Sequence, residues 1–308
     1  HGASGYGSGA GHFGVATQAA PTPPPNSEQY TNYGINDMTD SGKDRFSTFS
    51  IDVDTASYTI ARRKLNEGAL PPTASVRVEE FVNYFPYTYE APTSEAPFAV
   101  HMEAAPDPFN DGHHLFRVGI KAQDMDLSNR KPVHLTFLVD VSGSMNRPDK
   151  LGLAKRSLRL LTDQLRPGDT VALATYAGNV RAVLDPTDIR HKSQIHTAIE
   201  DLTASGSTAM SSGIQLAYSM AQASAKAGHE NRVIVLSDGD ANVGPASHQA
   251  ILESIKGYAQ NGITLSTIGL GMGNYKDTNM EQLANKGNGN YFYIDSLREA
   301  RRVFVEQL

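Results

Sequence analysis

The chain has 308 residues, a formal net charge of −6 and no cysteine. This length suits two medium domains, and the acidic balance without a basic run argues against nucleic-acid binding. The lack of cysteine excludes disulfides, thiolate metal sites and cysteine nucleophiles, and no stretch approaches the roughly 20 apolar residues of a membrane span.

The first 28 residues are rich in Gly, Ala, Ser and Pro. Such a composition buries too little apolar surface to order itself, so we expect a flexible tether and assign residues 1–45 to a tail and linker. The chain begins with His1 rather than Met, which fits either a removed signal or trimming. Assembly of copies of this chain through the tail is one hypothesis for its partners.

Residues 46–130 are expected to form a small α+β domain. Alternating apolar and polar residues predict strands, and apolar residues at helical spacing followed by a Gly stop predict helices. The strands are predicted at 46–53, 98–106 and 113–123, and the helices at 56–68 and 76–85.

From residue 131 to residue 308 strands alternate with helices. Such alternation predicts an α/β fold with a mostly parallel sheet flanked by helices on both faces. The expected strands are 133–141, 170–177, 180–185, 232–239, 263–270 and 290–294. The expected helices are 151–165, 193–202, 210–228, 248–260, a short one near 280–287 and a last one from Leu297.

Three loops of this region carry small oxygen donors, and we expect each at the carboxyl end of a strand. They contain the sequences DVSGS, SGSTAM and LSDGD. In an open α/β sheet such loops meet at one crevice, where ligands bind. The converging side chains are predicted to be Asp140, Ser142, Ser144, Thr208 and Asp238.

Five oxygen ligands without His or Cys are hard donors, which favour Mg²⁺ and leave Ca²⁺ or Mn²⁺ as alternatives. Two aspartates at most neutralise a divalent ion, and three hydroxyls add no charge. The bound ion therefore stays attractive to an incoming anion.

Other local patterns have ordinary explanations. Asp52 and Asp54 in SIDVDTASY lack complementary loops, and Asp54 or Thr55 is placed to cap the helix that follows. The glycines of GLGMGN have the wrong spacing for dinucleotide binding, which indicates a turn beside the crevice. His113 and His114 have no spaced partners, so we expect an exposed turn rather than a zinc site.

With these three loops, the sequence resembles the von Willebrand factor A domain family over residues 131–308, which implies the von Willebrand factor A (Rossmann-like) fold for this region. DVSGS, Thr208 and Asp238 match its metal-ion-dependent adhesion site. The resemblance implies that Ser142, Ser144 and Thr208 ligate the metal directly, while Asp140 and Asp238 act directly or through water. It also implies that a Glu or Asp of a partner protein completes the coordination.

Residues 46–130, with SIDVDTASYTIARRKL and VRVEEFVNYF, resemble the amino-terminal domain of a bacterial cell-envelope subfamily of these proteins. The resemblance implies an extracellular or envelope location, in the periplasm or at the cell surface. It also implies a further carboxy-terminal domain, whereas this chain stops at VFVEQL, so processing or truncation is expected.

The favoured hypothesis is a non-enzymatic adhesion or assembly module that binds a partner's carboxylate through the metal. A structural subunit with a non-essential metal site is the first alternative. The second is a Mg²⁺-dependent hydrolase, for which Asp240 is the candidate general base.

Overall fold

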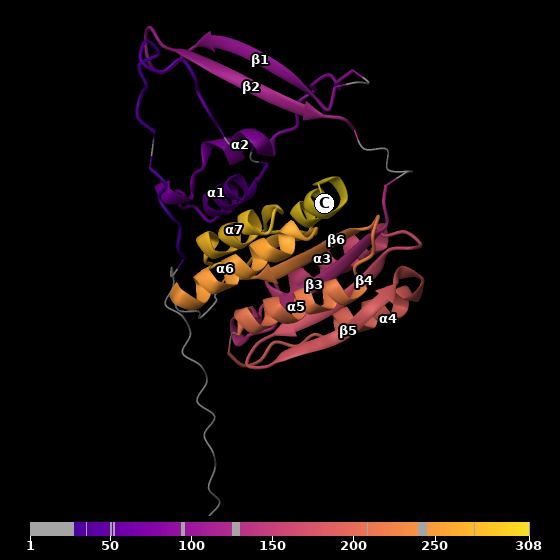
Figure 1. The fold of residues 1–308 in the computed structure, drawn as a ribbon. Helices are drawn as coiled ribbons and strands as arrows, with labels where there is room; N and C mark the ends of the chain where they lie inside the picture. Colours follow the sequence, from indigo (N-terminus) through magenta and orange to yellow (C-terminus); the bar gives the residue numbers. More distant parts are fainter. Residues whose placement is uncertain are drawn as a thin grey trace, which may run out of the picture.

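The computed structural model describes residues 28–34, 36–49, 51, 53–93, 96–124, 130–207, 209–239, 245–273 and 275–307 (Figure 1). The tether predicted at the N-terminus lies almost wholly outside these residues, as do Asp52 and Asp240.

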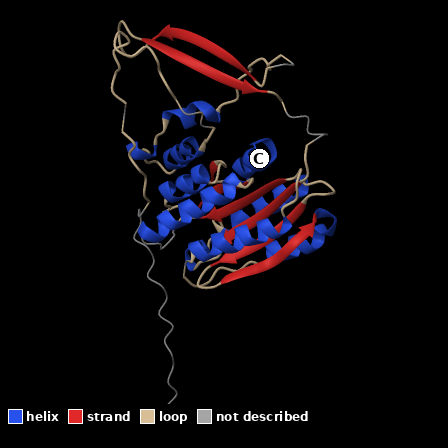
Figure 2. Ribbon diagram, in the orientation of Figure 1, coloured by secondary structure: helices blue, strands red, loops and turns tan. Residues whose placement is uncertain are grey.

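A six-stranded sheet forms the centre of the larger part of the molecule, with helices on both faces (Figure 2). Its strands are β3 (Val133–Asp140), β4 (Thr170–Tyr176), β5 (Val180–Asp188), β6 (Glu230–Ser237), β7 (Ile263–Leu270) and β8 (Tyr291–Ile294). They lie in the order β5-β4-β3-β6-β7-β8, and every pair is parallel except β4 with β5. The predicted fold class is confirmed.

Both faces of the sheet are buried under helices. Successive residues of each inner strand point to opposite faces, so each strand contributes side chains to two cores. In β3, Phe137 and Val139 belong to one hydrophobic core and Leu138 to the other. The first core is covered by α3 (Leu151–Gln164), α4 (Lys192–Glu200) and α8 (Leu297–Arg301). The second is covered by α5 (Met210–Ser224), α6 (Pro245–Gln260) and α7 (Asp277–Lys286).

The N-terminal part contains the helices α1 (Ala56–Asn66) and α2 (Val78–Tyr84) and an antiparallel hairpin. The hairpin strands, β1 (Phe98–Pro106) and β2 (His114–Ala122), lie apart from the six-stranded sheet (Figure 1). Helix α1 instead packs into the second core, where Ala56 and Ile60 are fully buried. The domain boundaries at 45/46 and 130/131 therefore stay predictions.

Two details at the start of this region differ from the sequence expectation. The strand expected at 46–53 does not form in its described residues, where Phe46 and Phe49 are 82% and 64% exposed and no strand pairs with them. Thr55 precedes α1 without a capping side-chain bond. Asp54 accepts a hydrogen bond from the Tyr291 backbone N–H at 2.8 Å, so its carboxylate ties α1 to β8.

Residues 28–33, the N-terminal strap, run along the start of α7. The Gln29 N–H donates to the Tyr275 carbonyl at 3.0 Å, and the Asp277 N–H donates to the Gln29 carbonyl at 3.2 Å. At the beginning of the strap, the 5%-exposed carboxylate of Glu28 accepts from Arg63 at 2.9 Å. The strap is therefore held by backbone pairing and a buried ion pair.

We expect Glu28→Gln to weaken the strap in a pH-dependent way. Burial raises the pKa of Glu28, but hydrogen bonds from Arg63 and Lys64 outweigh it and lower the pKa from 4.5 to about 2. A lowered folded-state pKa means that the stabilisation is fully present above pH 4.5 and is lost as the pH falls toward 2. At pH 7 the variant should lose about 2 kcal/mol of unfolding free energy, the range for hydrogen bonds to a charged group.

Urea unfolding of both proteins between pH 7 and pH 3 measures this difference. The difference in unfolding free energy between wild type and variant should become smaller as the pH falls. Glu253→Gln, which changes an exposed carboxylate of α6, is the matched control and should give no gap. A gap that is constant across this pH range would refute the assigned role of the Glu28 charge.

Candidate metal centre

The loop after β3 lies at the topological switch point of the sheet. Strand β3 pairs with β4 on one side and with β6 on the other, and in open α/β sheets ligands bind beyond the carboxyl ends of the strands at such a point. Asp140 is the last residue of β3, and Asp238 follows the last residue of β6 directly. Two of the five predicted site residues are thus placed at neighbouring strand ends.

Asp140 is fully buried and held on both oxygens. Its Oδ1 accepts from the Ser142 backbone N–H at 2.8 Å, and its Oδ2 accepts from the Ser237 hydroxyl at 2.9 Å. Burial, and secondarily the negative charge of Asp238, raise the pKa of Asp140 from 3.8 to about 6. The side chain is therefore positioned by the fold in a place that favours a nearby positive charge.

Ser142 and Ser144 follow in a tight 3₁₀ turn, Gly143–Met145. The Ser142 side chain is 2% exposed, and its Oγ lies 3.1 Å from the Ser144 Oγ. The turn brings both serine hydroxyls together beside the end of β3.

The loop that carries Thr208 reaches the same place by a different route than expected. It follows helix α4 rather than a strand, because residues 201–209 connect α4 to α5. Its backbone nevertheless pairs with the first loop: the Ser205 N–H donates to the Val141 carbonyl at 2.7 Å, and the Gly143 N–H donates to the Gly206 carbonyl at 3.0 Å. Thr208 itself lies outside the described residues, so its place in the site stays a prediction.

Asp238 is fully buried and forms an ion pair with Lys150, whose Nζ lies 2.9 Å from Oδ2. The next residue, Gly239, has a φ of +76°, and a Cβ there would lie 2.6 Å from the Lys276 carbonyl oxygen. Only glycine suits this turn, which allows the Lys276 N–H to reach the Asp238 carbonyl at 3.2 Å.

The donors gathered here suit a hard divalent cation. Two buried carboxylates and two serine hydroxyls offer hard oxygen donors, and one of the carboxylates, Asp238, already pairs with a cation, the Lys150 ammonium. In the described part of the chain no three His, Cys, Asp or Glu side chains are placed to hold a metal.

Two residues near the centre were not singled out in the sequence. Ser237 and Lys150 contact Asp140 and Asp238, but their partners are 97 and 88 residues away in the chain. Ser237 belongs to the LSDGD loop and could have been included with it. No local pattern distinguishes Lys150 from the other basic residues around α3.

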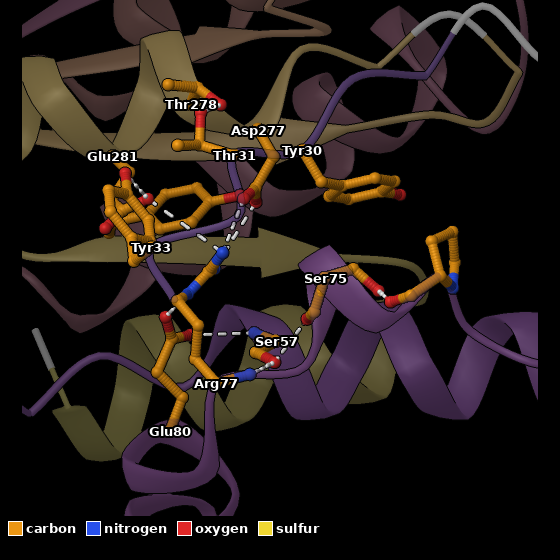
Figure 3. A network of polar contacts seen from close by, with 12 residues as sticks. Tyr30, Thr31, Tyr33, Ser57, Ser75, Arg77, Glu80, Asp277, Thr278 and Glu281 are labelled. Atoms are coloured by element: carbon orange, nitrogen blue, oxygen red, sulfur yellow. Dashed lines mark hydrogen bonds and ion pairs between the residues drawn. The ribbon is translucent and has the colours of Figure 1, made fainter. Parts of the chain in front are cut away.

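A second set of charged residues joins the N-terminal part to α7 (Figure 3). The Arg77 guanidinium donates to Asp277 at 2.6 Å and also pairs with Glu80, and all three side chains are at most 7% exposed. Glu80 in turn accepts from the Ser57 backbone N–H at 2.7 Å. Asp277 also accepts from the Tyr291 hydroxyl, so α1, α2, α7 and β8 meet in one buried network.

A mostly parallel α/β sheet with an oxygen-rich loop at its switch point is typical of the class of open-sheet domains that bind ligands beyond the strand ends. Residues 134–306, more than half of the chain, match the family model described as von Willebrand factor type A domain. The chain belongs to this family. Residues 24–117 match a second model, described as von Willebrand factor. Domains of this family are often metal-dependent protein-interaction modules.

The chain is similar to several bacterial proteins. It is 40% identical over 291 residues to "Uncharacterized protein YfbK" of Escherichia coli (strain K12), an alignment that covers 92% of this chain and 51% of that protein. It is 27% identical to "Uncharacterized protein sll0103" of Synechocystis, over 61% of this chain and 44% of that one. The chain thus spans about half the length of these curated relatives.

Among solved structures, a von Willebrand factor type A protein from Catenulispora acidiphila matches with a TM-score of 0.50 and 21% identity, covering 72% of this chain and 50% of that one. This likeness supports the fold. In the described residues, no helix combines the length and apolarity needed to cross a membrane.

Proposed function

We propose that this chain is a protein-binding module that depends on a divalent cation. Asp140, Ser142, Ser144 and Asp238, together with Thr208, would hold Mg²⁺, with Mn²⁺ or Ca²⁺ as substitutes. The observation that carries the proposal is the meeting of two buried carboxylates and two paired hydroxyls at the switch point of the sheet.

When bound, the metal supplies a strong, directional attraction for an oxygen anion. The protein residues fix where this attraction is offered: Ser237 and the Ser142 N–H hold the carboxylate of Asp140, and Lys150 holds that of Asp238. Two carboxylates at most neutralise a divalent ion, and the hydroxyls add no charge. A Glu or Asp side chain of a partner protein is therefore the proposed ligand, outside the cell or in its envelope.

Chelation is expected to abolish capture of the partner. The immobilised chain, incubated with native envelope extract in Mg²⁺, should retain a protein that is released by excess EDTA and that Asp140→Asn does not retain. The contrast between wild type and variant is measured by quantitative mass spectrometry. A protein retained equally in Mg²⁺ and in EDTA, and equally by both chains, would count against the proposal.

A further inference from the structure

Lys150 is a buried lysine whose side chain is enclosed by the protein on its ammonium end and along its stem. It is the residue before α3, six positions after Ser144, and its side chain is 3% exposed. Its Nζ lies 2.9 Å from Oδ2 of Asp238, whose side chain is fully buried. Removing an ammonium from water costs free energy unless an opposite charge is held next to it. The fold provides that charge, because it places the buried Asp238 carboxylate against the ammonium.

The aliphatic stem of Lys150 lies against the backbone of Gly271, the residue that follows β7. Gly271 has a φ of +81°, and a Cβ at this position would overlap the Cγ and Cε atoms of Lys150. The Gly271 carbonyl accepts from the Tyr293 hydroxyl, and the Arg63 Nη1 of α1 lies 3.4 Å from it. Residues from β8 and from the N-terminal helix thus hold the wall against which the lysine lies.

We propose that Lys150 is a positioning residue of the metal centre and its internal counter-cation, an inference that rests on the proposed metal-binding function. It holds the Asp238 carboxylate in place and neutralises it before the metal binds. With Asp140 and Asp238 contributing two negative charges and Lys150 one positive charge, an incoming cation meets one net negative charge.

This charge balance determines what the centre recognises. A divalent cation added to one net negative charge leaves one net positive charge, which a single carboxylate of the partner neutralises. The lysine therefore weakens metal binding, because the ammonium and the metal ion repel each other strongly where water is excluded. It also strengthens the preference for an anionic partner, because the occupied centre keeps a net positive charge. An aspartate pair without the lysine would leave no net charge, so the bound ion would attract a partner carboxylate less strongly.

Lys150→Met removes the charge and keeps much of the stem. In EDTA the variant should have a lower Tm than wild type, because Asp238 is left buried without its ammonium. Mg²⁺ should raise the Tm of the variant more than that of wild type, and calorimetry should give an affinity for Mg²⁺ at least about tenfold tighter. Lys150→Arg, which keeps the charge, should stay closer to wild type in both measurements.

Lys155→Met is the matched control, since Lys155 lies on the surface of α3 and its Nζ donates to the Glu200 carbonyl. It should leave the metal affinity unchanged. A Lys150→Met protein that folds only with Mg²⁺ supports the inference. Unchanged or weaker affinity, or failure to fold even with Mg²⁺, overturns it. Absence of Mg²⁺ binding by the wild type would instead contradict the proposed function itself.

Discussion

In an Asp140→Asn protein, Mg²⁺ affinity should fall by at least about 100-fold while the fold is retained. Loss of an outer residue that orients a metal ligand without repelling the cation already costs roughly 10- to 100-fold, and Asp140 is proposed to act at the metal itself. The amide can keep the local bonds, with its oxygen accepting from the Ser142 N–H and its NH₂ donating to the Ser237 hydroxyl. Isothermal titration calorimetry measures the affinity, and circular dichroism checks the fold.

The same substitution should stabilise the metal-free chain. Burial and the nearby Asp238 make the ionised Asp140 unfavourable, as its raised pKa of about 6 indicates, and the neutral amide removes this cost. Asp188→Asn, which changes a carboxylate that accepts from the Arg190 N–H far from the centre, is the control and should bind Mg²⁺ like wild type. Wild-type Mg²⁺ affinity in Asp140→Asn would show that the carboxylate does not serve the metal.

Arg77→Met should cause the largest loss of stability, about 3–5 kcal/mol, because it leaves buried carboxylates without their cation. Asp277 and Glu80, the carboxylates that accept hydrogen bonds from Arg77, are 0% and 1% exposed. Their uncompensated charges have no access to water in the folded state. The free energy of urea unfolding at pH 7 measures the loss.

The control is Arg117→Met, in the hairpin. Arg117 pairs with Glu103, but these side chains are 42% and 71% exposed, so removal of the pair should cost less than about 1 kcal/mol. A similar loss of unfolding free energy in the two variants would show that the network in Figure 3 does not stabilise the contact between the N-terminal part and α7.

Much of the fold is encoded in local patterns. The strands β3, β6 and β7 carry apolar residues on both faces, which is typical of strands covered by helices on both sides, and in the structure both of their faces are buried. The failure at 46–53 has the same physical basis. Alternation predicts a strand only where a partner strand exists, and the described residues of this stretch have none.

Some residues of the candidate site could be predicted from the sequence, and others could not. Asp140, Ser142 and Asp238 could be proposed from sequence, because strand ends are readable and the carboxyl ends of parallel strands meet at one edge. Lys150 and Arg77 could not, because each meets its carboxylate partner across long chain separations, 88 residues to Asp238 and 200 residues to Asp277. Such pairs depend on how whole elements pack, which no local spacing expresses.

The central claim is that a divalent cation binds between the loop after β3 and the loop after β6. Anomalous scattering from crystals of the chain grown with Mn²⁺ tests it most directly. The account predicts one strong peak within coordination distance of the Ser142 and Ser144 hydroxyls and near the carboxylates of Asp140 and Asp238, which is absent from Asp140→Asn crystals. No peak there, or a peak that persists in the variant, would contradict the claim.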